Sequence, residues 1–301
     1  MILKNNKNLK ENDFVNEKEL QTYFEKNLSE ILNLEFVATE FVVGSFRLDT
    51  VAFDNENNSF KIIEYKNVRN NSLIDQGYTY LKLLLERKAD FVLTYNNKTG
   101  KQLTVNDVDW SQSRILYVST VFTPYQLNAT DFSNAPFDLY KVIRYTEDIV
   151  NIELIKKTSN VKLDENKFKS ANIIQKEIKV YTEEDHMSKA NDDIKMAYQT
   201  LKDKVLELDD IDIDVKKVYI AFKGLRNIID VEFGRNFLQI TFNIKYGKLE
   251  DPENILSSYV LPDGKIIGHH GNGDYYISIK HENDVEKIIP FIKQSLKYNK
   301  K

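Results

Sequence analysis

The chain of 301 residues contains no cysteine, which excludes disulfide frameworks, iron–sulfur clusters, cysteine-based zinc fingers and thiol catalysis. It has only four histidines, so we expect no histidine-rich transition-metal site. Glycine and proline are scarce, at 10 and 5 residues, and this excludes collagen-like and Pro/Gly-rich disordered proteins. With 42% hydrophobic residues, the composition is that of a globular protein long enough for two domains.

Long apolar runs are also missing. No run approaches the roughly 18 residues of a membrane-spanning helix, and the first residues lack the apolar core of a signal peptide. We therefore expect a cytoplasmic protein with no membrane partner. The net charge of -4 is not that of a generally basic nucleic-acid binder, so binding to DNA would have to come from local charge or from metal ions.

Apolar periodicity predicts an N-terminal α/β domain over residues 1–157, with a mixed central sheet flanked by helices. The predicted helices are 17–32 and 73–88, and the predicted strands are 35–43, 46–53, 60–66, 90–95, 114–121, 137–145 and 149–156.

Residues 158–190 are polar and weakly periodic, which predicts a linker. Residues 191–301 predict a C-terminal α+β domain. Its predicted helices are 191–208 and 284–297, and its predicted strands are 215–223, 228–233, 236–245 and 274–280.

The segment FRLDTVAFD at 46–54 carries apolar side chains at both strand parities, which indicates a strand buried on both faces. Asp49 lies in the middle of it. A buried carboxylate without a partner costs several kcal/mol or shifts its pKa, so a compensating group is expected. A divalent cation is one such group.

The next predicted strand, FKIIEYK, supplies partner groups. Glu64 and Lys66 are two residues apart and point to the same face of the strand. Asp49 lies one strand earlier, across a turn of hairpin length. Two carboxylates from adjacent strands with a lysine beside them have the composition of an oxygen-ligand Mg²⁺ site. On the following helix, Gln76 and Tyr80 are four residues apart and share one face.

These residues resemble the PD-(D/E)XK restriction-endonuclease-like superfamily. Asp49 and Glu64-Tyr65-Lys66 match its D…ExK core, and Gln76 to Tyr80 resembles the QxxxY motif of the RecB-like branch. The run Phe46-Arg47-Leu48-Asp49 is similar to the G-R-I-D motif of NucS-type endonucleases, with Phe46 where that family often has glycine. The resemblance extends from about Glu17 to Glu153.

The resemblance implies a metal-dependent endonuclease that hydrolyses DNA phosphodiester bonds and leaves a 5′-phosphate. Asp49 and Glu64 would bind Mg²⁺ or Mn²⁺, aided by the backbone carbonyl of Tyr65. Lys66 would position the attacking water. The resemblance assigns further roles to Gln76, which would hold Lys66 or a phosphate, to Tyr80, and to Glu19, which would complete the site through water, with Glu25 as the alternative.

The C-terminal half resembles a domain of unknown function found behind such cores in bacterial proteins labelled "predicted transport protein". We expect it to recognise substrate or to mediate self-association, for instance as a homodimer. The rival hypothesis for the whole chain is a catalytically silent module of the same fold that binds nucleic acid or protein. The intact Asp49, Glu64 and Lys66 favour the enzyme.

We expect Asp49→Ala to abolish binding of Mg²⁺ or Mn²⁺ while the protein stays folded. The substitution removes one of two carboxylate ligands, and it also removes a buried charge, so the metal-free protein should lose no stability. Calorimetric titration with Mn²⁺ measures this directly. An unchanged affinity in the variant would contradict the assignment of Asp49.

Overall fold

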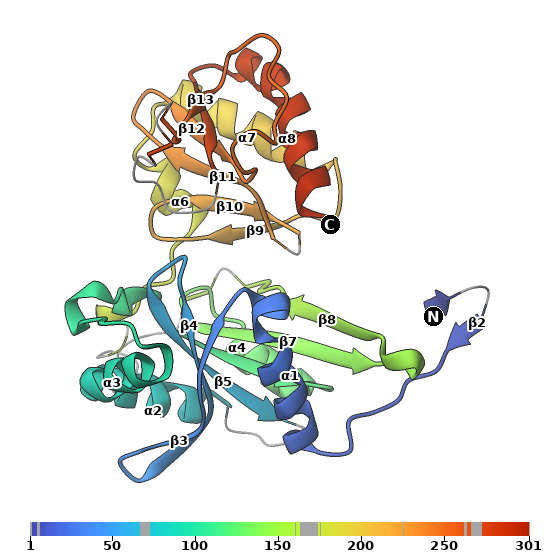
Figure 1. Cartoon of the computed structure of the whole chain (residues 1–301), viewed down its shortest axis with the longest axis vertical. Coiled ribbons are helices and arrows are strands. Elements are labelled where there is room, and N and C mark those ends of the chain that lie inside the picture. Colours follow the sequence, from blue (N-terminus) through green and yellow to red (C-terminus); the bar gives the residue numbers. More distant parts are fainter. Residues whose placement is uncertain are drawn as a thin grey trace. The chain divides into compact units, whose positions relative to one another are not determined.

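The computed structural model describes residues 2–4, 7–66, 73–159, 161–162, 174, 176–224, 226–261, 264–265 and 273–300. The chain divides into two compact units, Met1–Val180 and Tyr181–Lys301 (Figure 1). The division falls inside the stretch 158–190, for which a linker was predicted. Each unit has a sheet and a hydrophobic core of its own.

The first unit alternates strands and helices. Its elements are β1 (Ile2–Lys4), β2 (Lys7–Leu9), α1 (Glu17–Leu32), β3 (Glu35–Val43), β4 (Phe46–Asp54), β5 (Ser59–Lys66), α2 (Leu73–Glu86), α3 (Lys88–Thr99), β6 (Arg114–Ser119), α4 (Pro124–Thr130), β7 (Phe137–Arg144) and β8 (Val150–Ile155).

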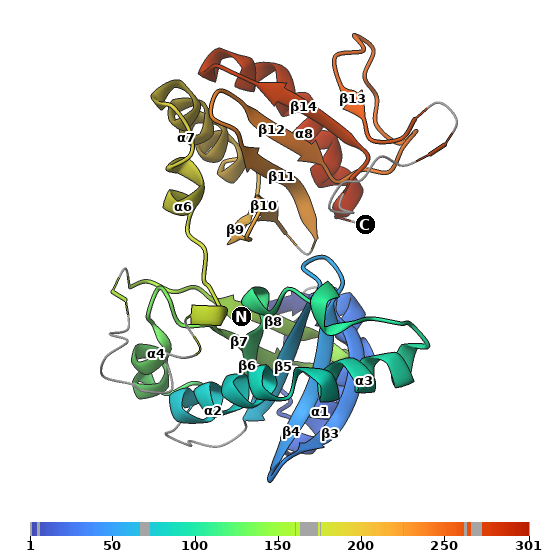
Figure 2. The same ribbon diagram turned by 90° about the vertical axis from the view of Figure 1, so that its left-hand side faces the viewer.

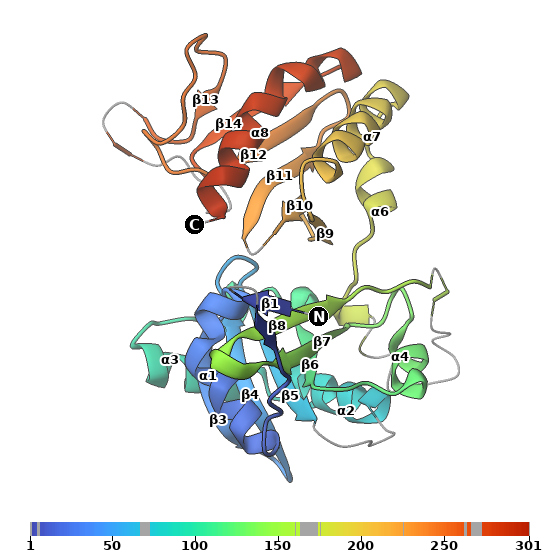
Figure 3. The same ribbon diagram turned by 90° about the vertical axis from the view of Figure 1, so that its right-hand side faces the viewer.

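Strands β3 to β8 form a six-stranded mixed sheet in that order, in the described part of the unit. β6 pairs in parallel with β5 and with β7, and the other neighbours are antiparallel. α2 and α3 cover one face of the sheet (Figure 2), and α1 covers the other (Figure 3). Phe60 packs among the residues of α2 and α3, whereas Tyr65 packs on Phe24 of α1. The predicted α/β fold, a mixed sheet flanked by helices, is confirmed.

Helix α1 begins where its sequence predicts. The side chain of Asn16 accepts a hydrogen bond from the backbone N–H of Glu19 at 2.9 Å, which satisfies one of the free donors at a helix start. The helix ends at Leu32, because Asn33 follows in the left-handed region with φ of 55°. Leu20, Phe24 and Leu28 form its buried side, which faces the sheet.

The predicted strand 90–95 is wrong, because these residues lie inside helix α3. β-branched and aromatic residues in DFVLTY favoured a strand, but Phe91, Val92 and Tyr95 recur at helical spacing and are all buried. Phe91 packs on Phe60, with 5.6 Å between ring centroids. Packing of this face against the sheet outweighs the local strand preference.

Gly77 allows α2 to approach the sheet closely. A Cβ atom at this position would lie 2.5 Å from the Cε1 of Phe137 and 2.7 Å from the hydroxyl of Tyr117. Any larger residue would therefore push the helix away from β6 and β7. Gln76 and Tyr80 lie on the same helix, so the close approach that Gly77 allows also brings their side chains nearer to the sheet.

The second unit is an α+β domain, as predicted. Its described strands form one antiparallel sheet in the order β13-β14-β12-β11-β10-β9, and α7 and α8 cover one of its faces (Figure 3). Its elements are α6 (Glu183–Met187), α7 (Asp192–Leu206), β9 (Asp212–Val215), β10 (Ile220–Lys223), β11 (Asn227–Phe233), β12 (Leu238–Phe242), β13 (Ser257–Ser258), β14 (Tyr275–Ile279) and α8 (Val285–Asn299).

The predicted single strand 215–223 is wrong, since a turn divides it into the hairpin of β9 and β10. Val215 pairs with Ile220, and the backbone N–H of Lys216 donates to the carbonyl of Tyr219 at 2.9 Å. The core-facing positions shift from odd in β9 (Ile213, Val215) to even in β10 (Ile220, Phe222), and this change of parity marks the turn. No helix in the described part of the chain combines the length and apolar character needed to cross a membrane.

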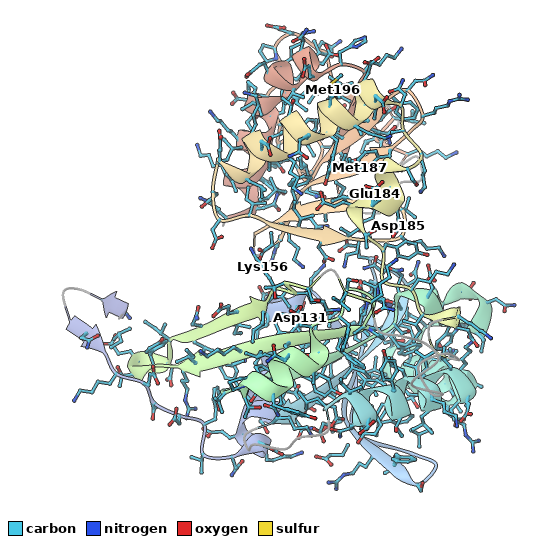
Figure 4. All side chains as sticks on the ribbon, turned by 180° about the vertical axis from the view of Figure 1, so that it is seen from behind. Asp131, Lys156, Glu184, Asp185, Met187 and Met196 are labelled. Carbon is cyan, nitrogen blue, oxygen red and sulfur yellow. The ribbon has the colours of Figure 1, made fainter. Side chains whose placement is uncertain are left out.

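The segment after β8 is fastened to the first unit by Asp131, which is labelled in Figure 4. Its carboxylate accepts hydrogen bonds from the backbone N–H groups of Thr158 and Ser159 and from the Thr158 hydroxyl, at 2.6 to 3.1 Å. Further along, Ile174 and Ile178 are buried in the core of the same unit. Parts of the stretch 158–190 thus contribute to the first unit.

We expect Gly77→Ala to destabilise the protein. Overpacking costs about 1–3 kcal/mol, and the better helix propensity of alanine returns up to roughly 1 kcal/mol, so the net loss should be about 1–2 kcal/mol. Denaturant unfolding measures it. Lys82→Ala, on an exposed part of α2, is the matched control and should stay close to wild type. Equal unfolding midpoints for both variants would show that α2 does not depend on this close approach.

Candidate active site

Asp49 of β4 and Glu64 of β5 lie side by side. The antiparallel register pairs Thr50 with Ile63, which places Asp49 opposite Glu64 on the sheet face that α2 covers. The backbone N–H of Asp49 donates to Oε1 of Glu64 at 3.2 Å, and the backbone N–H of Tyr65 donates to Oδ2 of Asp49 at 3.1 Å. Each strand therefore holds the carboxylate of the other.

Lys66 lies beside this pair. It follows Glu64 by two residues on β5, and its Nζ is 3.5 Å from Oε2 of Glu64. Both side chains are largely enclosed, since Glu64 is 1% exposed and the Lys66 side chain 14% exposed. An ion pair in such surroundings is screened much less by solvent than one on the surface.

Helix α2 adds two polar groups to the same cluster. Nε2 of Gln76 donates to Oε2 of Glu64 at 2.9 Å and to the hydroxyl of Tyr80 at 3.0 Å. The Tyr80 hydroxyl donates to the carbonyl of Arg47 at 3.4 Å, and the Phe46 ring meets the Tyr80 ring edge-on. The structure therefore brings together Asp49, Glu64, Lys66, Gln76 and Tyr80. Their catalytic and metal-binding roles stay predictions.

The two glutamates considered from α1 are engaged elsewhere. Glu19 accepts hydrogen bonds from Arg144 at 2.8 Å and from the backbone N–H of Val15 at 2.5 Å, and these interactions lower its pKa. Glu25 accepts from the hydroxyl of Thr50 at 2.6 Å. Because Thr50 alternates with Asp49 along β4, Glu25 is on the opposite face of the sheet from Glu64.

Three groups near Asp49 were missed by the sequence reasoning. Gln21 of α1 donates to the backbone carbonyl of Asp49 at 2.8 Å. Glu40 of β3 is close enough for its charge to raise the pKa of Asp49. Arg47 forms an ion pair with Glu40 at 2.8 Å. Arg47 lies within the quoted motif and could have been singled out, but the contacts of Gln21 and Glu40 depend on strand and helix pairing that no local pattern shows.

The surroundings of the pair favour protonated carboxyl groups. Burial, followed by the negative charge of Asp49, raises the pKa of Glu64 from the ordinary 4.5 to about 8. Burial is also the main reason that the pKa of Asp49 is raised, while the backbone N–H of Tyr65 and the charge of Lys66 oppose the shift. The single positive charge of Lys66 therefore does not compensate the negative charges of both carboxylates.

A shared divalent cation would supply the missing compensation. Carboxylate oxygens are the ligands that Mg²⁺ and Mn²⁺ prefer. Over the described residues, no group of three or more aspartate, glutamate or histidine side chains could hold a metal ion. A cation at Asp49 and Glu64 would therefore complete its shell with backbone oxygen, water or substrate phosphate, which is usual for Mg²⁺. The donor set fits such an ion.

Comparison with known proteins gives one match over nearly the whole chain. The chain is 42% identical over 293 residues to a protein of Haemophilus influenzae strain Rd described as an uncharacterized protein, and the alignment covers 96% of this chain and 95% of that protein. Residues 183–298 match the domain of unknown function DUF5655. The expectation of a C-terminal domain of unknown function is confirmed.

Solved structures with partial similarity are an EndoMS complex with dsDNA, a repair endonuclease from Pyrococcus abyssi, and Pyrococcus furiosus SfsA in complex with Ca²⁺. Their TM-scores are 0.29, 0.23 and 0.23, with identities of 15%, 14% and 16%. The matches cover 42%, 40% and 45% of this chain, and only 44%, 45% and 60% of those chains. Function has to be argued from the site itself.

We expect the metal-free protein to lose stability as the pH rises from about 5 to about 8. The pKa of Glu64 is raised on folding, so over this window the folded protein keeps a proton that the unfolded chain has released, and the free energy of unfolding falls. Thermal unfolding in EDTA at several pH values measures the trend. Glu64→Gln should flatten it, whereas Glu19→Gln, at a partly exposed glutamate whose pKa is lowered, should not. Parallel curves for wild type and Glu64→Gln would refute the assigned shift.

Proposed function

We propose that this chain, which belongs to the same family as the Haemophilus influenzae protein, is a metal-dependent nuclease with its reaction centre at Asp49 and Glu64. One observation carries the proposal: the buried carboxylate of Glu64 and the partly buried carboxylate of Asp49 face each other from adjacent strands, with the Lys66 amine 3.5 Å from Glu64. A structural ion pair needs one carboxylate for one lysine. Here the second carboxylate adds repulsion, which a bound proton relieves in the metal-free protein and which a further cation would relieve without that proton.

Asp49 and Glu64 would hold Mg²⁺ or Mn²⁺ with help from the backbone carbonyl of Tyr65. The bound ion would supply Lewis-acid stabilisation of the phosphate and a lowered pKa of water. DNA as the substrate is favoured by the resemblance of Asp49 and Glu64-Tyr65-Lys66 to the PD-(D/E)XK motif. Membership of that superfamily is part of this proposal.

Lys66 can act on the attacking water. Its amine lies next to Glu64, so it can orient the water toward phosphorus and stabilise negative charge that builds up on the phosphate oxygens. Water then adds to phosphorus, the bond from phosphorus to the 3′-oxygen breaks, and a 5′-phosphate and a 3′-hydroxyl result. The proton released by the water passes to solvent, and a proton returns to the leaving oxygen.

Gln76 and Tyr80 are positioning residues in this scheme. Gln76 donates to the Glu64 oxygen that also faces Lys66, so it limits the orientations of that carboxylate. Tyr80 in turn anchors Gln76 and is tied to the Arg47 carbonyl. Glu19 has no part in the proposal, because Arg144 and Val15 already hold its carboxylate.

We expect Lys66→Met to keep Mn²⁺ binding and to lose cleavage by at least about two orders of magnitude, because it removes the amine and spares both ligands. Cleavage of single-stranded, branched and mismatched DNA in Mg²⁺ or Mn²⁺ is the measurement, with calorimetry for the metal. Lys82→Met is the control for loss of a lysine.

Two outcomes would decide against this proposal. If wild type cuts none of these substrates with either ion, the chain is better explained as a binding module of the same fold. If Lys66→Met cuts as fast as wild type, the activity resides elsewhere and the role given to Lys66 is wrong.

A further inference from the structure

Outside the reaction centre, three charged side chains meet next to Asp49. The Glu40 carboxylate receives the Lys18 ammonium on one oxygen and the Arg47 guanidinium on the other, each at 2.8 Å. The three residues come from β3, α1 and β4, which are separate elements of the first unit. Two cations on one carboxylate leave the cluster with a net positive charge, beside the two carboxylates of the reaction centre.

Glu40 is held in an unusual backbone conformation. Its φ is 47°, in the left-handed region that residues other than glycine rarely adopt inside a strand. The strand pairs Thr39↔Thr50 and Phe41↔Leu48 flank it, so it lies across from Asp49. Such strain persists only where surrounding contacts maintain it, and it is concentrated at functional sites. Here the two ion pairs supply those contacts.

The cluster is connected to the reaction centre on both sides. Lys18 donates to Oε1 of Gln21 at 3.1 Å, and Gln21 donates to the carbonyl of Asp49 at 2.8 Å. On the other side, the carbonyl of Arg47 accepts from Tyr80. Arg47 also precedes Asp49 by two residues on β4, so both side chains leave the same face of the strand.

We infer that Lys18 and Arg47 form a phosphate subsite that binds a phosphodiester of the substrate strand adjacent to the one that is cleaved. This inference rests on the proposed nuclease function. The side chains of Lys18 and Arg47 are 60% and 67% exposed, so donors that Glu40 does not use face solvent. A neighbouring phosphate supplies the anion that such donors bind, and phosphate contacts set the position of a strand without reading its sequence.

Glu40 is the positioning residue of the subsite. By pairing with both cations it fixes where their free donors point, which lowers the entropy lost when a phosphate binds. The negative charge of Glu40 also limits the net charge of the three residues to +1. A subsite with so small a charge can position the substrate strand and still release the product.

The test measures binding separately from cleavage. In the full-length Lys66→Met chain, the affinity for a labelled single-stranded DNA is determined by fluorescence anisotropy over a series of salt concentrations. Each lost phosphate contact on single-stranded DNA lowers the slope of log K against log salt by about 0.7. We expect Lys18→Gln and Arg47→Gln each to reduce the slope by about that amount and to weaken binding several-fold at low salt. Lys82→Gln, at another exposed lysine, on α2, should change neither.

The outcomes separate this inference from the nuclease proposal. Wild-type slopes for both variants, or slopes reduced equally by Lys82→Gln, would overturn the subsite, and so would DNA binding without salt dependence. If the variants lower the slope while the wild-type chain cuts no DNA with Mg²⁺ or Mn²⁺, the subsite stands and the nuclease proposal fails. If wild type cuts DNA and both variants bind with its slope, the subsite fails and the nuclease proposal stands. Thermal unfolding confirms that each variant is folded.

Discussion

The candidate site of the first unit depends on the placement of two carboxylates side by side, with Glu64 buried and Asp49 partly buried. Burying one charge costs several kcal/mol unless it is paired, and burying two of the same sign adds their repulsion. The two carboxylates are stabilised by backbone N–H groups from both strands, by the amide of Gln76 and by the amine of Lys66. These donors still leave the pKa of Glu64 raised to about 8, and the proposed cation would supply the remaining compensation.

The sheet makes this placement possible, and the helices complete it. Because β4 and β5 are interior strands of a sheet covered on both faces, Asp49 and Glu64 are directed under α2 rather than into solvent. Gly77 then lets α2 approach β6 and β7, so that the short side chain of Gln76 reaches Glu64. The same packing that stabilises the core thus sets the geometry of the candidate site.

The candidate site lies entirely within one of the two units. The candidate site draws on β3, β4, β5, α1 and α2, all within Met1–Val180. The second unit, which contains the match to DUF5655, has an antiparallel sheet and its own core. The similarity to the Haemophilus influenzae protein spans both units, so the two units occur together in that relative as well.

Periodicity and spacing in the sequence were enough to predict the sheet strands around the site, helix α1, and a shared face of Glu64 and Lys66. Each of these features depends on neighbours a few residues away. The helix at 90–95 and the hairpin within 215–223 were decided by packing and turn geometry, which override local preference. Tertiary packing also determines which acidic groups lie near Asp49. The family resemblance pointed to Glu19, yet strand pairing brings Glu40 beside Asp49, and Arg144 holds Glu19. Contacts between residues far apart in the chain arise only from the register of strands and the seating of helices, and those are properties of the folded structure.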